Sequence, residues 1–545
     1  METTQVKPRH KVKATGVRSD APSVSPGPGR VRASYMRDTQ SGVIAARPAS
    51  LREHRDEIRR VWTRAAGLAM DLLQNSGKLR GAADQIIADT VGIELQLNPR
   101  PDLTRFGYSP EETTVWIRDL KAAWKIWAWN PLECDFRAKW TIPQMTDIGV
   151  RHWLAFGESV GVCQYLPRSQ RLAGTQSGTK FLLLSPQQLV QDTNDVEGLY
   201  QGVVHDSYGR PIAYRFEEKR DGFRQKKDYA ARDSDGRQMV MHAYDPFSSD
   251  DVRGISPLVT TFRKYLMAEN VDDATAQLMF LQTIYAAILK SDKPSAEAFE
   301  ALDMMKEAGG AGAADIASDF VDYFKAQLDR AAESEIRLGP GAGVSHLAPG
   351  EDMEFKSITA PGPNHKDVIG TFNRETARAL GITYGGYTLD FTAATYASTQ
   401  MENASTWPIA RRRTDRIASP HVLIPYASWV DERIETGLTP FKGGIEVYRA
   451  NREAILWAIC TGPSKPTADD VKKAKGASER IINGTGTLEQ EISEDGGDPE
   501  EVFENRLYWH NRYIKAGMKS PFERGLPSDP SASSDEPAGK GKVDA

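Results

Sequence analysis

The ordered part of the chain opens with helical periodicity. Apolar residues recur every three or four positions from Leu51 to Gln74, and Arg and Glu fill many of the remaining positions. This spacing predicts an amphipathic helix lying on a core, because the apolar side chains share one face. The face consists of Ile58, Val61, Trp62, Ala65, Leu68, Leu72 and Leu73.

Two further helices and a strand are predicted next. The segment LRGAADQIIADTVG has helical spacing and leads into IELQLN, which is strand-like. A third helix is expected from about Pro110 to Trp129. It carries a tryptophan cluster that we interpret as core and subunit packing: Trp116, Trp124, Trp127 and Trp129.

Between Phe181 and Phe247 the pattern changes to alternation. The segments FLLLSPQQLV, LYQGVVHD and PIAYRFEE place apolar and polar residues at a period of two, which is typical of strands. A turn from Asp206 to Pro211 would join two of them. Together with the preceding helices, these strands indicate that residues 50–250 form an α+β domain.

A long helix is predicted after this domain. Ser256 and Pro257 supply an N-cap and a first-turn proline, and helical spacing continues to Lys290. Such a helix would be about 50 Å long at 1.5 Å per residue. The following residues contain a helical piece and short strand-like pieces broken by Gly and Pro, and a second helix then runs from about Asn364 to Gly381. The chain is expected to run outward along the first helix, form a small distal unit, and return along the second helix.

A loop rich in Gly, Tyr and Thr follows the return helix. Residues 382–397 combine flexibility and hydroxyl groups with little apolar bulk, which suits contact with something polar and mobile. Another helix is predicted from about Gln400 through Arg411 to Trp429, and residues 465–518 are mostly helical in pattern. The loop is therefore expected to be held between helices.

Composition limits the classes of function. Forty per cent apolar and 26% charged residues indicate globular material, whereas residues 1 to about 45 and the tail from about Ser520 are expected to be flexible. A net charge of −5 gives no overall attraction to nucleic acid, so tight sequence-specific DNA binding is disfavoured. Neither a signal peptide nor a membrane span is expected, since the most apolar stretch, Leu278–Leu289, is too short.

The patterns of catalytic and metal sites are weak. Cys134, Cys163 and Cys460 are far apart, which supports neither disulfides nor a zinc cluster and favours assembly in a reducing cytoplasm. The segment AGTQSGTKF (173–181) has the wrong spacing for a nucleotide-binding Walker A loop, so a polar hairpin loop is favoured. His205 with Asp206, and His242 near Asp245, are interpreted as turn residues. We expect no catalytic residue, metal or cofactor.

Two charged features have alternative explanations. The pairs Asp250-Asp251, Asp272-Asp273 and Asp469-Asp470 could bind Mg²⁺, but solvent-facing positions and helix starts explain them more simply. The run Arg411–Arg413 could contact phosphate groups. Pairing with carboxylates such as Asp415 and Glu432 is the favoured alternative.

The order of several short motifs resembles a known family. The motifs are LREHRDEIRRVWTRAAGLAMDLLQ, IIADTVGIELQLN, WAWNPLECDFRAKWTIPQM, LAFGESVGV, VVHDSYGRPIAYRF, DDVRGISPLVTTF, HLAPGEDMEF and ALGITYGGYTLDFTAATYASTQ. In this order, from about Leu51 to Lys519, the chain resembles the lambda-type portal proteins of tailed bacteriophages. The resemblance implies a homo-oligomeric ring, usually of twelve subunits, around a central DNA channel at one vertex of an icosahedral head.

The resemblance also implies a division of the chain. A flexible arm (1–48) would precede the wing (49–252), the outgoing stem helix (253–291), the clip (292–357) and the return stem helix (358–381). The tunnel loop (382–397), a long helix with the wing return (398–464), a helical crown (465–519) and a disordered tail (520–545) would follow. Long insertions make the clip boundaries approximate.

The implied function is structural. The ring would nucleate head assembly, admit DNA during terminase-driven packaging, release it at ejection, and join head to tail. Implied partners are further copies of the chain, the major capsid protein, the terminase large subunit, a head-tail connector and non-specific double-stranded DNA, without a membrane. The ring would be assembled in the host bacterial cytoplasm and reside in the virion. The alternative from another class is an enzyme of DNA packaging, an ATPase or a nuclease.

Candidate DNA-facing residues follow from the same resemblance. On the stem they are Arg263, Lys264 and Lys290. Where relatives carry an arginine after the loop this chain has Gln400, which leaves the role of that arginine open here. In the tunnel loop the candidates are Tyr384, Gly385, Gly386, Tyr387, Thr388, Phe391, Thr392, Thr395 and Tyr396.

Overall fold

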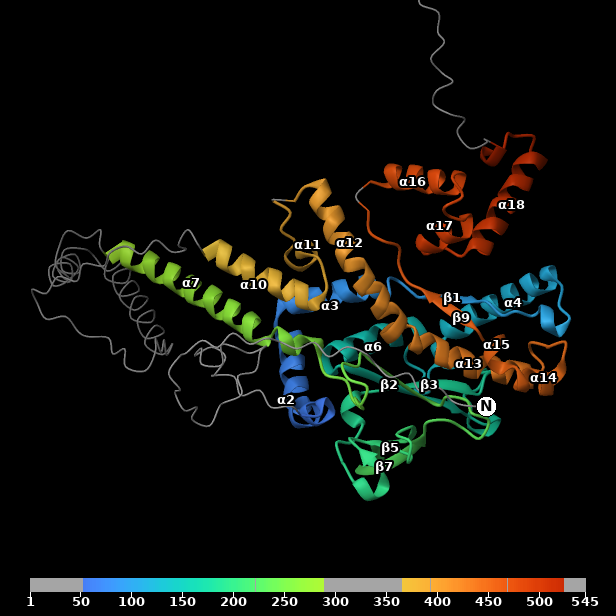
Figure 1. Ribbon diagram of the computed structural model, residues 1–545, viewed down its shortest axis with the longest axis horizontal. Helices are drawn as coiled ribbons and strands as arrows, with labels where there is room; N and C mark the ends of the chain where they lie inside the picture. The colour runs from blue at the N-terminus through green and yellow to red at the C-terminus, as the bar shows by residue number, and fades with distance from the viewer. Residues whose placement is uncertain (1–51, 221, 289–364, 393, 468, 524–545) are drawn as a thin grey trace, which may run out of the picture. The chain divides into compact units, whose positions relative to one another are not determined.

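The computed structural model describes residues 52–220, 222–288, 365–392, 394–467 and 469–523 (Figure 1). The chain divides into two units, Met1–Glu53 and His54–Ala545, and every helix and strand below belongs to the second. The predicted N-terminal arm, the clip, Lys290 and most of the predicted tail lie outside the described residues.

The N-terminal helices form as the sequence predicts. Helix α2 (His54–Asn75) buries Ile58 and Trp62 on its apolar face, although Val61 of that face is 43% exposed. Serine or threonine caps begin the next long helices because each side-chain oxygen accepts a backbone N–H of the first turn. These helices are α3 (Gly77–Thr90), α4 (Pro110–Ala128) and α6 (Ile142–Phe156), with the short α5 (Pro131–Cys134) before α6.

Three antiparallel sheets complete the α+β architecture. β1 (Gln96–Pro99) pairs with β9 (Ala458–Thr461), and a second sheet has the order β3-β2-β8. A third sheet follows the chain order β4-β5-β6-β7. The predicted turn after Asp206 joins β5 to β6, with Gly209 at a φ of 79°. The strands are β2 (Glu158–Tyr165), β3 (Thr179–Leu184), β4 (Leu199–Tyr200), β5 (Val203–His205), β6 (Pro211–Arg220), β7 (Phe223–Ala230) and β8 (Val240–Tyr244).

An aromatic cluster lies in the largest core. The ring centroid of Trp124 is 5.0 Å from that of Trp127 and 5.5 Å from that of Trp429, and Tyr426 packs edge-on at 5.6 Å. The prediction that the α4 tryptophans pack in a core is confirmed for Trp116, Trp124 and Trp127. Trp129 instead is 45% exposed and donates its indole N–H to Glu94 at 2.6 Å.

The predicted long helix begins later than its sequence suggests. Ser256 caps a 3-10 turn (η5, Pro257–Thr260), and the α-helix α7 runs from Phe262 to Ile288. The break occurs because the Thr261 hydroxyl, like the Thr261 backbone N–H, donates to the carbonyl of Leu258, which closes the tight turn. The return helix α10 (His365–Leu380) packs against α7 and ends at Gly381 with φ 64°, as predicted.

The chain then re-enters the core. Short helix α11 (Tyr384–Thr388) precedes α12 (Tyr396–Arg413), a π-helical turn (Thr414–Ala418) and α13 (Pro420–Glu435). This series confirms the helix predicted between Gln400 and Trp429. Helices α14 (Gly444–Ala450) and α15 (Arg452–Ile455) lead to β9.

Three helices make up the predicted helical region after residue 465. They are α16 (Asp470–Ile482), α17 (Leu488–Glu494) and α18 (Pro499–Lys515). None of the described helices is long and apolar enough to cross a membrane. The remaining 3-10 turns are η1 (Thr104–Phe106), η2 (Arg168–Gln170), η3 (Pro186–Gln188), η4 (Asp195–Glu197) and η7 (Pro521–Glu523).

Candidate functional site

A buried ionic network lies where the sheets meet the start of the stem. The Arg253 guanidinium pairs with the Glu158 carboxylate, and both residues are at most 1% exposed. Arg253 also donates to the carbonyls of Gln201 and Pro186 at 2.9 and 3.2 Å, and its guanidinium lies 4.7 Å from the Trp62 ring. Burial alone would raise the pKa of Glu158, but Arg253 and His242 outweigh burial and lower the pKa to about 2. The network therefore holds two full charges in the interior.

Two glycines allow the close approach at this junction. A Cβ on Gly157, whose φ is 86°, would lie 2.1 Å from the backbone of Ile255. A Cβ on Gly254 would lie 2.1 Å from the carbonyl oxygen of Gly157. The Ser256 hydroxyl donates to the carbonyl of Leu154 at 2.6 Å. The end of α6 and the start of the stem thus touch through backbone atoms.

Ion pairs join helices α7 and α10, the two helices predicted to form the stem. Lys264 on α7 pairs with Glu375 on α10 at 3.3 Å and lies over the Phe372 ring. Asp272 on α7 accepts from His365 of α10 and from Lys78 of α3, at 3.4 and 3.5 Å. The structure therefore places the predicted DNA-facing Lys264 against the return helix. Arg263 is exposed.

The predicted tunnel loop is partly helical. Thr383 caps α11 by accepting the Gly386 N–H at 3.0 Å, and α11 packs against α3 and α10. Tyr387 is 5% exposed and Gly385 is buried, so these two candidate residues belong to the core of this subunit. Burial raises the pKa of Tyr387 to about 12. The structure differs from an open loop here because the Thr383 cap closes a helical turn.

The candidate residues of α11 that remain accessible have local partners. Tyr384 is half-buried under the Arg374 guanidinium, 5.2 Å from the ring centroid. Thr388 is also half-buried and donates its hydroxyl to the carbonyl of Tyr384 at 2.9 Å. Gly386 lies beside Thr383 and Gln85.

The second half of the segment is more exposed than α11. Leu389 adopts a left-handed φ of 56° and is 76% exposed, which is unusual for a branched side chain. The Asp390 carboxylate accepts from the backbone N–H and hydroxyl of Thr392, and these hydrogen bonds lower its pKa. The Phe391 ring is 57% exposed and rests on Gly385, since a Cβ there would lie 2.6 Å from the ring. We call residues 389–395 the tip.

The end of the tip begins the next helix. Thr395 caps α12, with the Ser398 N–H donating to its hydroxyl at 3.2 Å. Thr392, Thr395 and Tyr396 are exposed, and Lys472 lies 4.7 Å above the Tyr396 ring. Gln400, the position at which the resemblance implied an arginine, is half-buried. Phe391, Thr392, Thr395 and Tyr396 are thus the candidate loop residues that face outward.

Arg413 anchors the entry to this segment, a role that the sequence did not reveal. Its guanidinium donates to the Leu380 carbonyl at the end of α10, at 2.6 Å, and lies 5.1 Å from the Trp153 ring. Burial lowers the pKa of Arg413 to about 10. A cation at a helix C-terminus is stabilised by the unpaired carbonyls and the helix dipole.

The other two arginines of the run pair with carboxylates. Arg411 lies 4.0 Å from Asp415, as predicted, whereas Arg412 pairs with Asp245 at 3.1 Å. Glu432, the other predicted partner, pairs with Arg171 at 3.4 Å instead.

In the segment 173–181, which was compared with a Walker A loop, backbone N–H groups donate to carboxylates of the same chain. The backbone N–H groups of Gln176 and Ser177 donate to Glu133, at 2.7 and 2.9 Å. Those of Gly178 and Thr179 donate to Glu432 at 2.6 and 2.8 Å. These are the groups that a phosphate-binding loop would direct at its ligand. The interpretation of this segment as a structural loop is confirmed.

The other candidate chemistry has structural explanations. Asp469 caps α16 through the Lys472 N–H, and Asp251 accepts from the backbone of Phe247 and Ser248. His242 bonds to Glu158 at 2.9 Å. Among the residues that the structure describes, no group of three or more His, Cys, Asp or Glu is placed to hold a metal ion.

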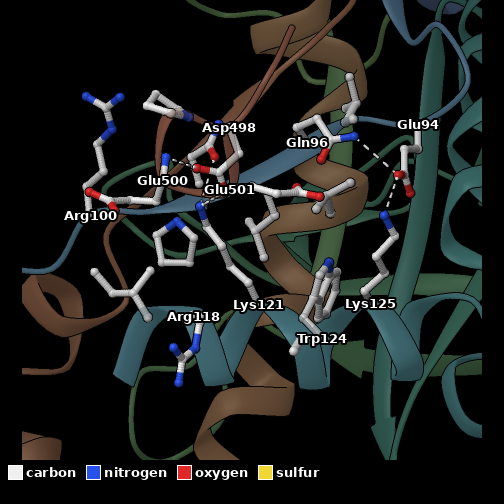
Figure 2. Close-up of a pocket in the computed structure, with 18 of the residues that line it drawn as sticks. Glu94, Gln96, Arg100, Arg118, Lys121, Trp124, Lys125, Asp498, Glu500 and Glu501 are labelled. Carbon is white, nitrogen blue, oxygen red and sulfur yellow. Dashed lines mark hydrogen bonds and ion pairs between the residues drawn. The ribbon is translucent and has the colours of Figure 1, made fainter. Parts of the chain in front are cut away.

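A cavity of about 700 Å³ lies between α4, β1 and the C-terminal helices (Figure 2). Its apolar wall includes Trp124, and Figure 2 shows Lys121 reaching from α4 to Asp498 across it. Two more ion pairs cross the same seam, Arg100–Glu489 at 2.9 Å and Arg118–Glu504 at 3.4 Å. Because these charges are paired across the cavity, it lies at an interface between α4 with β1 and the C-terminal helices of the same chain.

Sequence comparisons agree with the predicted family. A family model described as phage portal protein, lambda family, matches residues 41–414. Portal protein B of Escherichia phage lambda is 25% identical over 483 residues, covering 85% of this chain and 88% of that protein. The portal protein of Escherichia phage N15 is 23% identical over 481 residues, with the same coverage.

Chains from gene transfer agent (GTA) particles are among the solved structures that match this chain. A chain from the neck of an empty GTA particle covers 83% of this chain and 94% of its own length, with 13% identity and a TM-score of 0.37. A chain from the virion of a native GTA particle covers 81% and 99%, with 14% identity and a TM-score of 0.31.

The matched family span runs from before α2 through the ionic network, helices α7 and α10, the tip and α12. The C-terminal helices lie beyond it. The family is a structural, non-enzymatic component of phage heads, in agreement with the prediction that the chain is not an enzyme. The chain belongs to the lambda family of phage portal proteins.

Proposed function

We propose that the chain is the subunit of a closed ring, of twelve copies as a working number, at the special vertex of a phage head, with double-stranded DNA passing through its centre. The family match over residues 41–414 carries this proposal. Within that span, the paired helices α7 and α10 are followed by the short helix α11 and then by an exposed tip, which is an arrangement suited to presenting a short segment to a channel.

The tip is the proposed contact with DNA. Phe391, Thr392 and Thr395 of the tip are exposed, as is Tyr396 directly after it, and the tip lacks Lys and Arg. A channel that lets DNA slide in both directions should not hold the phosphates strongly, because each phosphate contact by a cation adds affinity. Hydroxyl and aromatic groups provide weak contacts instead. Tyr387 and Gly385 support the tip from the core side.

The stem candidates have different roles in this proposal. Lys264 is engaged with Glu375, so its charge stabilises the helix pair. Arg263 is exposed on α7 and is the stem residue proposed to face the channel. Lys290, outside the described residues, stays a prediction.

The remaining roles follow from family membership. The ring would nucleate head assembly in the host cytoplasm, contact the major capsid protein, dock the terminase large subunit during packaging, and join the head to a tail connector. The support is that the chain matches the family and spans 88% of the curated lambda and N15 portal proteins.

The proposal is tested by changing the tip without touching its supports. Replacing residues 389–394 with a Gly-Ser segment of equal length should leave rings in electron micrographs but reduce packaged DNA per particle at least about tenfold. The same kind of replacement in the exposed turn 207–209 is the control and should preserve packaging. Unchanged packaging, or a failure of rings to form, would show that the tip does not have the proposed role.

A further inference from the structure

The two walls of the cavity in Figure 2 carry opposite charge. On the side of α4 and β1 it is lined by Arg100, Arg118 and Lys121, together with Lys125, which pairs with Glu94 at 3.5 Å. The wall of the C-terminal helices has only acidic groups among its charged lining residues, all of which the structure describes. They are Glu489, Asp498, Glu500, Glu501 and Glu504.

The contacts that cross the cavity are ionic. Two of the three ion pairs join side chains that are about half exposed, and such pairs contribute little individually and are screened by salt. The third pair is less exposed, at 22% and 10% of its two side chains. The pairs are Arg100–Glu489, Arg118–Glu504 and Lys121–Asp498.

Apolar packing adds little to this interface. None of the residues of α16, α17 and α18, all of which the structure describes, is buried. Phe503 lines the cavity and is still 60% exposed. A close-packed interface leaves few voids larger than a water molecule, whereas this one leaves about 700 Å³ unfilled. The attraction between the two walls therefore depends mainly on their charges.

A short connector joins the C-terminal helices to the body. Residues 462–467, between β9 and α16, form neither helix nor strand and include Pro463 and Pro466. Because β9 ends at Thr461, a movement that begins in the connector would leave the pairing of β1 with β9 intact. The helices can therefore move as a unit without unfolding the body.

We propose that α16, α17 and α18 form a unit that docks on α4 and β1 through these three ion pairs at low ionic strength and undocks as the ionic strength rises. Undocking would expose the cationic wall of α4 to solvent. The contacts lie within one copy of the chain, so the proposal does not depend on the ring or on the contact between the tip and DNA.

A distance between two spin labels in the full-length protein tests the docking. Val115→Cys on α4 and Ile514→Cys on α18 suit the labels, because the native side chains are 45% and 51% exposed and neither lines the cavity. Native Cys134, Cys163 and Cys460 are buried, and burial raises the pKa of each to about 12, so they should not react. Mixing with excess unlabelled protein removes distances between copies.

Salt should change the measured distance. Pulsed electron spin resonance should give one distance in about 0.1 M NaCl, where the Debye length is about 10 Å. In about 1 M NaCl, where it is about 3 Å, a second and longer distance should account for at least about half of the molecules. A single distance at both salt concentrations would overturn the proposal, and so would two distances already at the lower one.

Exchanging the charges tests the ion pairs themselves. Arg100→Glu with Arg118→Glu should produce the longer distance at the lower salt concentration, and adding Glu489→Arg with Glu504→Arg should restore the shorter one. Failure of either result would overturn the assignment to these pairs.

A matched control is available in the body. Arg449 pairs with Glu435 at 2.9 Å, and these side chains are 49% and 42% exposed, close to the values for Arg118 and Glu504. Arg449→Glu should leave the distance between the labels unchanged. A shift as large as that of the double reversal would show that net charge, rather than the pairs across the cavity, controls the position of the helices.

Discussion

The body of the subunit, from α2 to β9, and the C-terminal helices that follow it differ in how much of their surface they bury. Around β2 and α13 the protein buries an ion pair, a tryptophan cluster and a backbone contact between glycines. Helices α16, α17 and α18, whose residues are all described, bury no side chain at all. The body therefore has its own core, whereas the C-terminal helices leave most of their surface exposed. Substitutions of the same kind should therefore have opposite consequences in the two regions.

Tryptophan removal gives the largest expected contrast. Trp429 is 1% exposed between Trp124 and Trp127, so Trp429→Ala should lower the free energy of unfolding by about 3–5 kcal/mol. Trp509→Ala on α18 should change that of the isolated subunit by less than about 0.5 kcal/mol. Equilibrium denaturation measures both, and equal losses would remove the distinction between the two regions.

Gly→Ala substitutions should also lower the free energy of unfolding by different amounts in the two regions. Gly157→Ala should cost about 3 kcal/mol or more, because φ is 86° and the new Cβ would lie 2.1 Å from Ile255. Gly517 also has a positive φ, 70°, but nothing lies within 4 Å of its Cβ position. Gly517→Ala should therefore cost only about 1–2 kcal/mol. Thermal unfolding of the two variants would expose a wrong assignment if Gly517→Ala were the more damaging.

Acidification should weaken the body. Burial lowers the pKa values of His152 and His421 from 6.5 to about 4, so between these values the unfolded chain binds more protons and stability falls as the pH falls. Burial raises the pKa of Asp147 from 3.8 to about 6, which acts in the opposite direction. The two histidine shifts of about 2.5 pKa units each, less the Asp147 shift of about 2.2 units, leave a net loss of about 3–4 kcal/mol as the pH falls from 6.5 to 4, at about 1.4 kcal/mol per pKa unit.

Denaturation across this pH range tests the prediction. His421→Gln should flatten the pH dependence of the free energy of unfolding, because the His421 ring is fully buried and one of its nitrogens lies 2.8 Å from the Ser159 hydroxyl. His510→Gln, on the surface of α18, should leave the slope unchanged. A free energy of unfolding that rises on acidification would show that the Asp147 carboxyl contributes more than the two histidines.

The seam between the two regions should be the least sensitive. Arg118→Met removes the pair with Glu504, but an ion pair whose two side chains are about half exposed contributes about 0–1 kcal/mol. The expected change is therefore below about 1 kcal/mol and smaller still in high salt. A loss of several kcal/mol would mean that the C-terminal helices are part of the body's fold.

The sequence predicted elements better than it predicted contacts. Periodicity and caps located α2, α4, the strands from β3 to β8, and the return helix with its Gly381 terminus. It did not reveal α11, because Gly385 and Gly386 disfavour a helix locally and only the Thr383 cap with packing on α3 offsets them. The separate fates of Arg411, Arg412 and Arg413 also depend on tertiary neighbours.

The candidate site was predicted as a segment but not residue by residue. Tyr387 and Tyr396 belong to the same composition pattern, yet one is 5% and the other 48% exposed. Lys264 has the charge expected of a DNA-facing residue but lies against Glu375. Exposure depends on which side of a short helix each residue occupies, and that side is set by residues far away in the sequence.

Imaging the purified full-length protein by cryo-electron microscopy tests the central proposal most directly. The account predicts closed rings with a central channel and the tip at residues 389–395 on its inner wall. Particles that are only monomers or two-fold dimers, or rings in which the tip lies on the outer surface, would contradict it.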